Sequence, residues 1–131
     1  MSASPGFEGP SLFQSVVEQA PDVIIFADRE GVIRIWNHAA EAMFGYQASE
    51  VVGKSLDVII PERLRAAHWK GFDHAFASGE TKYGGRAMTT RATHKDGSKV
   101  YVDMSFGLVR DQGGAVVGAL AIARKQIEKK A

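Results

Sequence analysis

The sequence contains no cysteine among its 131 residues. Disulfide bonds, cysteine nucleophiles, zinc sites built on thiolates and c-type haem attachment all require that residue, so each of them is excluded. A tightly held cofactor must therefore bind non-covalently, or through nitrogen, oxygen or thioether ligands.

Long apolar runs and a strong excess of charge are also missing. No stretch approaches the roughly 18 apolar residues of a transmembrane helix, and the start, MSASPGFEGPS, lacks the basic and apolar regions of a signal peptide. The formal net charge is +1 and the lysines and arginines are scattered, so neither nucleic acid nor a membrane is expected as a partner. We expect a cytoplasmic protein.

What is present is an ordinary globular mixture, with 45% hydrophobic and 24% charged residues, in a chain long enough for one domain. Prolines and glycines predict a flexible arm over residues 1–10. Ser11 can then cap a short amphipathic helix that ends before Pro21. The β-branched runs DVIIFAD and REGVIRIWN follow, and they predict two strands joined in a hairpin.

The middle of the chain favours helices and the last third favours strands. Helical spacing in HAAEAMFGY and ASEVVGKS predicts two short helices, and a longer helix is expected from about Pro61 to Ser78. Three strands are expected next, over about residues 83–93, in KVYVDMSFGLV and in AVVGALAIAR, and a charged helical end follows. This order predicts an α+β domain with one antiparallel sheet, helices on one face, and room for a pocket between them.

Several of these segments are familiar in combination. The strand pair ending in WN, then AAEAMFGY, VVGKS and KDGS, resembles the PAS domain family of sensory modules over nearly the whole chain. The resemblance implies a five-stranded antiparallel sheet with helices on one face, a PAS domain over residues 11–124, and the start of a C-terminal signalling helix over residues 125–131. It also implies a small ligand in the sheet–helix pocket, or a dimerisation role, and an output domain such as a histidine kinase in cis or trans.

The missing cysteine narrows the choice of ligand within that family. Blue-light flavin PAS domains and photoactive yellow proteins both use a cysteine, so both are excluded, whereas non-covalent flavin stays open without residues that favour it. Haem b needs one axial ligand and an apolar slot, and neutral imidazole is the commonest such ligand. At about 100° per residue, Leu64, His68, Gly71 and Phe72 fall on one helical face, and His74 falls toward the polar side.

The helix carries a further resemblance. The frame formed by Arg65, His68 and Ser78–Glu80 is similar to the haem-binding PAS domains of FixL-type oxygen sensors, which place their proximal histidine on this helix. The tyrosine and arginine that typically follow the histidine are replaced here by Gly71 and His74. The resemblance implies that His68 is the metal ligand of a haem b that senses a diatomic gas or redox state.

On the distal side of such a haem, the resemblance makes Met88 a candidate sixth ligand and Arg86 a candidate contact for bound gas. The other residues expected to bind the cofactor are Leu64, Gly71, Phe72, Met104, Leu120 and Ile122. Ordinary roles stay open for all of them, since a histidine at this helix position can simply pack or hydrogen-bond, and Met88 and Arg86 can be plain strand residues.

Two other functions remain as alternatives. The domain can bind a different small molecule, or act only as a dimerisation module, with an interface on the N-terminal helix around Leu12, Phe13, Val16 and Val17. We expect a homodimer. Enzymatic activity is not expected, because the sequence shows no nucleophile–base pair, no phosphate loop and no paired carboxylates that have a reason to lie in a pocket.

Overall fold

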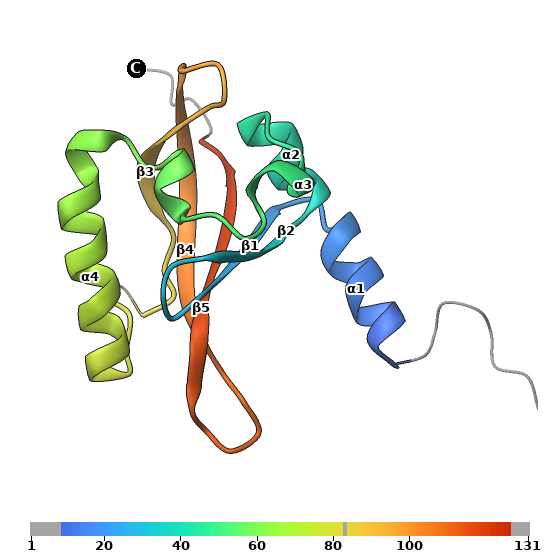
Figure 1. Ribbon diagram of the computed structural model, residues 1–131, viewed down its shortest axis with the longest axis vertical. Helices are drawn as coiled ribbons and strands as arrows, with labels where there is room; N and C mark the ends of the chain where they lie inside the picture. Colours follow the sequence, from blue (N-terminus) through green and yellow to red (C-terminus); the bar gives the residue numbers. More distant parts are fainter. Residues whose placement is uncertain (1–8, 83, 127–131) are drawn as a thin grey trace, which may run out of the picture.

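The computed structural model describes residues 9–82 and 84–126, and its centre is one five-stranded sheet (Figure 1). The strands are all antiparallel and lie in the order β2-β1-β5-β4-β3. Their bounds are Val23–Asp28 for β1, Ile33–Trp36 for β2, Met88–Thr93 for β3, Lys99–Arg110 for β4 and Val116–Lys125 for β5. The five expected strands and the expected α+β fold are therefore confirmed.

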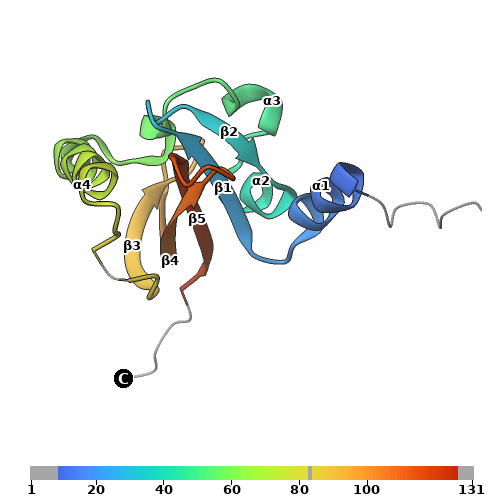
Figure 2. The ribbon, with the colours of Figure 1, turned by 90° about the horizontal axis from the view of Figure 1, so that it is seen from below.

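Helices fill the segments before and between the strands. The α-helices are α1 (Gly9–Gln19), α2 (His38–Phe44), α3 (Ala48–Val51) and α4 (Arg65–Ser78), and two 3₁₀ turns, η1 (Leu56–Ile59) and η2 (Glu62–Leu64), precede α4. In both views α1 stands on the far side of the sheet from α4 (Figures 1 and 2). None of the helices in the described part of the chain is long and apolar enough to cross a lipid bilayer.

Four boundaries differ from the expectations. Helix α1 begins at Gly9, two residues before the expected cap. The helix expected from Pro61 starts as the 3₁₀ turn η2, because the amide of Leu64 bonds back three residues to the carbonyl of Pro61, and tight turns of this kind are common at helix starts. Strand β3 begins at Met88. The C-terminal helix was expected over residues 125–131, but Lys125 still belongs to β5, and residues 127–131 lie outside the described residues.

Strand pairing decides which side chains face the helices. Within the sheet, Ile25 of β1 lies opposite Ala121 of β5, and Ala121 lies opposite Phe106 of β4. Side chains of paired residues share a face, so these three point to the same side. The buried core lies on that face and continues under α2 and α3 through Trp36, Phe44 and others.

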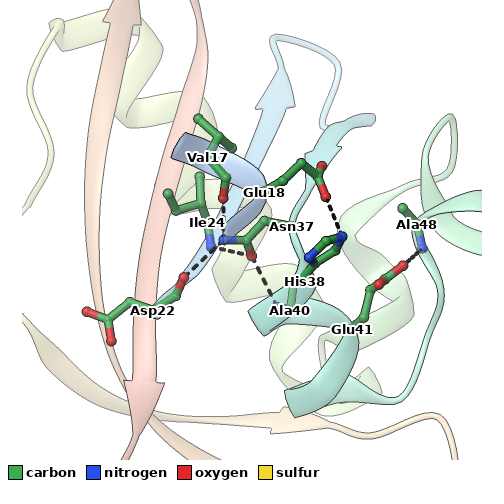
Figure 3. A network of polar contacts seen from close by, with 9 residues as sticks. All are labelled: Val17, Glu18, Asp22, Ile24, Asn37, His38, Ala40, Glu41 and Ala48. Atoms are coloured by element: carbon green, nitrogen blue, oxygen red, sulfur yellow. Dashed lines mark hydrogen bonds and ion pairs between the residues drawn. The ribbon is translucent and has the colours of Figure 1, made fainter. Parts of the chain in front are cut away.

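One buried amide joins three elements at the edge of this core. Asn37 is fully buried, with 0% of its surface exposed, and it caps α2 (Figure 3). Its Oδ1 accepts hydrogen bonds from the amides of Ile24 (2.9 Å) and Ala40 (3.1 Å). Its Nδ2 donates to the carbonyls of Val17 (2.8 Å) and Asp22 (3.0 Å). The side chain therefore connects α1, the start of β1 and α2 with all of its hydrogen-bonding capacity in use.

Removing this amide should destabilise the domain strongly. We expect Asn37→Ala to lower the free energy of unfolding by about 3 kcal/mol, since it leaves buried backbone groups without partners. Asn37→Asp should cost at least as much, because it places a carboxylate against two carbonyl oxygens. Urea denaturation measures both, with Gln14→Ala on the exposed face of α1 as the control. A loss below about 1 kcal/mol for both Asn37 variants would contradict this role.

Candidate functional site

Helix α4 presents a row of aromatic rings to the sheet. The His68 and Phe72 rings lie 5.9 Å apart between centroids, and the Phe72 and Phe76 rings lie 4.6 Å apart. The spacing of four residues puts these three rings on one helical face. None of the fourteen described residues of α4 is fully buried, so this face is only partly covered by the rest of the domain.

The space left under α4 is a pocket of about 290 Å³ between the helix and the sheet. Its lining consists of Ile25, Ala27, Leu56, Ala67, His68, Gly71, Phe72, Ala75, Phe76, Thr81, Lys82, Gly85, Arg86, Phe106, Leu108, Ala119, Leu120 and Ala121. Most of these side chains are apolar. Sites for small molecules have this character, with a few polar groups among hydrophobic walls.

The amino-acid sequence of β5 explains why the pocket exists. On the face toward α4 this strand carries Ala119, Ala121 and Ala123, beside Ile25 of β1 and Phe106 and Leu108 of β4. Three small residues in the middle strand leave a trough along the sheet. Phe106, which borders the trough, is 38% exposed although it lies on the inner face of a central strand. A ligand above it would complete the packing.

His68 brings a buried polar atom into this apolar wall. Its Nδ1 is buried and has no hydrogen-bond partner among the described residues. Burial lowers the pKa of His68 below its ordinary value, and the negative charge of Asp57 partly opposes the shift. The imidazole is therefore neutral near pH 7 and keeps a nitrogen lone pair available for a metal or a donor.

A tryptophan beside His68 fixes the position of α4. The Nε1 of Trp69 donates a hydrogen bond to Oδ1 of Asp57 on η1 (2.7 Å). The far side of the indole lies against Gly31 in the turn between β1 and β2, where a Cβ atom would overlap the ring. The guanidinium of Arg29 in the same turn lies 5.3 Å from the centre of the Phe76 ring. The β1–β2 turn thus supports the helix that carries His68.

The structure brings together some of the residues expected to bind the cofactor and not others. His68, Gly71, Phe72, Arg86 and Leu120 belong to the pocket lining, whereas Leu64, Met88, Met104 and Ile122 do not. Leu64 falls on η2 rather than on α4. Met88 and Met104 pair with each other across β3 and β4, farther along the sheet.

Strand register accounts for the remaining two positions. Ile122 pairs with Ile24, and Leu120 pairs with Phe26, so their side chains point to the face away from α4. Leu120 still borders the pocket, between the two inward-facing alanines 119 and 121. Residue patterns missed Phe76, Phe106 and these alanines. The four-residue spacing of Phe76 from Phe72 could have predicted that Phe76 lies in the pocket. The sequence alone does not show which side chains of β5 face the helix.

The other three histidines lie away from the pocket. His38 begins α2, and its Nε2 lies 3.1 Å from Oε2 of Glu18 on α1 (Figure 3). His74 is exposed on α4, as its place on the polar side of the helix predicted. His94 is half-buried against Gly45 beside the turn between β3 and β4.

A comparison with protein-family models decides the family. The model described as the PAS fold matches residues 11–125, which is most of the chain. The chain belongs to the PAS family. The strand order, the alanine trough and the helix with His68 are thus features of one PAS domain.

Known proteins similar to this PAS domain include oxygen and other sensors. It is 28% identical over 102 residues to the oxygen sensor protein DosP of Escherichia coli, which is 78% of this chain and 13% of DosP. It is 24% identical over 100 residues to the sensor protein FixL of Bradyrhizobium diazoefficiens, which is 76% of this chain and 20% of FixL. The chain thus spans a fifth or less of these curated relatives.

Solved structures agree on the fold. The crystal structure of a PAS domain from Colwellia psychrerythraea superimposes with a TM-score of 0.75 at 21% identity, and the match covers 88% of this chain and 94% of that one. At this level of identity the likeness establishes the architecture. The five-stranded sheet with its helices is therefore the PAS architecture.

The contact between Gly31 and Trp69 gives a test of how α4 is held in this PAS domain. Gly31 and Gly53 both have left-handed backbones, with φ of 77° and 93°, but only at Gly31 would a Cβ atom meet another residue within 4 Å. We expect Gly53→Ala to cost about 1–2 kcal/mol of unfolding free energy from backbone strain. Gly31→Ala should cost about 2 kcal/mol more, from overlap with the indole.

Urea denaturation in a Trp69→Ala background separates the two costs. Without the indole, Gly31→Ala should cost no more than Gly53→Ala. An equal penalty for Gly31→Ala with and without Trp69 would show that the ring does not rest on the turn.

Proposed function

We propose that this PAS domain is a sensory module that holds haem b in the pocket under α4, with His68 as the axial ligand. The observation that carries the proposal is the buried Nδ1 of His68, which has no partner among the described residues and lies in the wall of an apolar pocket. A buried polar atom without a partner costs free energy, and such positions persist where function requires them. A haem iron would supply a site for a diatomic gas or for an electron.

The chemistry of the pocket fits this cofactor. A neutral imidazole is the form that ligates iron, and burial keeps His68 in that form. The apolar rings of Phe72 and Phe106 offer flat surfaces on opposite walls, one on α4 and one on β4. Similarity to an oxygen sensor and to FixL supports the same function.

The size of the pocket requires one adjustment. A volume of about 290 Å³ lies at the lower end of the range for sites that hold drug-sized molecules, so a macrocycle needs α4 to lie farther from the sheet. Such a shift moves no fully buried residue of α4 among its described positions, but it has to keep or release the contacts of Trp69 with Asp57 and Gly31. Gly71 faces the pocket without a side chain and leaves room on the helix side.

The distal residues take different places in this proposal. Arg86 borders the pocket and remains our candidate contact for a bound gas. Met88 stands at the start of β3, outside the present lining, so its role as a sixth ligand depends on the wider form of the pocket. The domain would pass its signal to an output domain such as a kinase, because the relatives are several times longer than this chain.

Haem binding is tested by absorption spectroscopy of the purified protein with added haemin. We expect a Soret band that saturates at one haemin per chain and shifts on reduction with dithionite and on addition of carbon monoxide. His68→Ala should lose this band because the axial nitrogen is gone. The matched control is His74→Ala, which removes an exposed imidazole from the same helix and should bind haemin as the wild type does.

A featureless visible spectrum with no stoichiometric uptake would refute the haem assignment. The pocket would then belong to another small molecule, and His68 would be a packing residue beside Trp69, whose ring centroid lies 4.7 Å away.

We also propose that the domain forms homodimers through α1. Phe13 and Val16 on this helix are 70% and 60% exposed, although large apolar side chains are ordinarily covered. They lie three residues apart and so share one face of the helix. A second copy of the chain would cover both.

Dimerisation is tested by sedimentation equilibrium across micromolar concentrations. The double variant Phe13→Asp, Val16→Asp should raise the dimer dissociation constant at least about tenfold, because it places charges in an apolar contact. The control, Gln14→Asp with Ser15→Asp, adds the same charge to exposed polar positions of the same helix. A wild-type protein that stays monomeric throughout would eliminate this interface.

A further inference from the structure

Strand β4 extends well past the strand beside it. Met88, the first residue of β3, pairs with Met104, so β3 covers β4 only up to that point. From there β4 continues to Arg110 and, within the described part of the chain, pairs only with β5. Residues 105–109, which we call the open half of β4, therefore form an unpaired edge even though β4 lies inside the sheet.

One backbone hydrogen bond shows which residues face this edge. The amide of Gln126, just after β5, donates to the carbonyl of Tyr101, so Tyr101 turns its backbone groups toward β5. The pairing of β4 with β5 is regular from there up to residue 109. Backbone groups alternate in direction along a strand, so even-numbered residues of β4 point the other way. Phe106 and Leu108 therefore direct their N–H and C=O groups to the open side.

The backbone groups on the open side have no partner within the part of the chain that the structure describes. No hydrogen bond joins Phe106 or Leu108 to the loop that follows α4. Each residue carries one N–H and one C=O, so the open half of β4 offers two donors and two acceptors. Such groups in a row form a template for another extended chain.

Native sheets usually protect an edge of this kind, and the open half of β4 lacks the usual devices. Lysines, prolines and bulges on an edge discourage pairing with another chain. The sequence SFGLV of residues 105–109 has no charge and no proline, and its register shifts only between Val109 and Arg110. The outer edge of β3, by contrast, carries Arg91. The open half of β4 is therefore the less protected of these two edges.

The open half of β4 borders a groove of about 550 Å³, and the loop after α4 forms the opposite wall, between Gly79 and Gly85. Arg110 fixes one end of the groove, because its Nη2 donates a hydrogen bond to the carbonyl of Gly79 (3.2 Å). A Cβ atom built on Gly84 would meet nothing within 4 Å, so the loop wall is open at that point. Because the loop runs beside the edge, the groove admits a single extended chain more readily than the edge of a second domain.

We infer that the open half of β4 binds an extended peptide segment of a partner protein, which adds to the sheet as an antiparallel strand. Residues of the peptide opposite Phe106 and Leu108 would share the inner face with these two apolar side chains. The segment should therefore carry apolar residues at alternate positions, and one of them would cover the Phe106 ring, which is 38% exposed. The inference does not depend on which ligand occupies the pocket under α4.

Binding is tested by NMR spectroscopy of isotope-labelled protein with an end-blocked peptide of alternating valine and threonine, with a lysine at each end. We expect saturable shifts, and hydrogen exchange at the amides of Phe106 and Leu108 should slow at least about fivefold. The amide of Gly107 faces β5, so its exchange should change by less than about twofold. Binding on a face of the sheet would not produce this alternation.

Two methylated peptides provide a matched pair of probes. In the expected pairing, the N–H groups of the valines face β4 and those of the threonines face away from it. N-methylation of the valines should raise Kd at least about tenfold, because it removes the hydrogen-bond donors. N-methylation of the threonines adds the same kind of group and should leave Kd within about twofold.

A variant of the protein tests the same hydrogen bonds from the other side. Leu108→Pro removes an N–H that faces the groove, and proline is tolerated in a strand where the N–H has no partner. It should raise Kd of the unmethylated peptide about fivefold. The control, Leu108→Val, keeps the N–H and an apolar side chain and should stay within about twofold. The methylated peptides give the same test if Leu108→Pro does not fold.

Four results would overturn the inference. The first is no saturable binding up to about 1 mM peptide, and the second is protection of Thr89 and Arg91 on β3 instead of β4. The third is slow exchange at Phe106 and Leu108 in dilute protein without peptide, which would mean that the chain's own loop already pairs with this edge. The fourth is protection that grows with protein concentration alone, which would make the occupant a second copy.

Discussion

The fold depends on how one amide is buried. Asn37 sits where the chain leaves the β1–β2 hairpin and enters α2, and its four hydrogen bonds reach α1, β1 and the first turn of α2. A buried amide is tolerated only when its donors and acceptors are satisfied, so the chain has little freedom in how these elements meet. Because β1 lies next to β5, this constraint also sets the inner face against which the pocket is built.

The pocket results from two independent properties of the sequence. Small residues on β5 leave a trough on the inner face of the sheet. Helix α4 is held in place by contacts of Trp69 and Phe76 rather than by a buried face of its own. A helix that packed its own apolar stripe onto the sheet would close the space. The sequence of α4 prevents this, because polar residues and glycine interrupt the stripe.

Much of the fold and part of the pocket lining could be predicted from residue patterns, and the wrong predictions have a physical cause. The helical angles around His68 depend on local geometry, and they placed Gly71 and Phe72 on the correct face, although Leu64 fell on η2. Which side chains of β5 face the helices depends on the register of this strand with its neighbours. Large apolar side chains usually face the core, but here the alanines face the helices, whereas Leu120 and Ile122 face outward. Without knowledge of the pairing partners, sequence reasoning assigns the larger residues of β5 to the inner face. The position of Met88 likewise depended on where β3 begins.

The trough beneath α4 also has a consequence for the lifetime of the protein. A cavity between apolar side chains lowers stability, and a ligand that binds only the folded form raises stability with the logarithm of its concentration once the site is nearly saturated. Cellular proteases remove the unfolded fraction, so modest differences in stability change steady-state abundance. Phe106 is 38% exposed beside the trough, so the ligand proposed above would, by covering this ring, lengthen the lifetime of each copy.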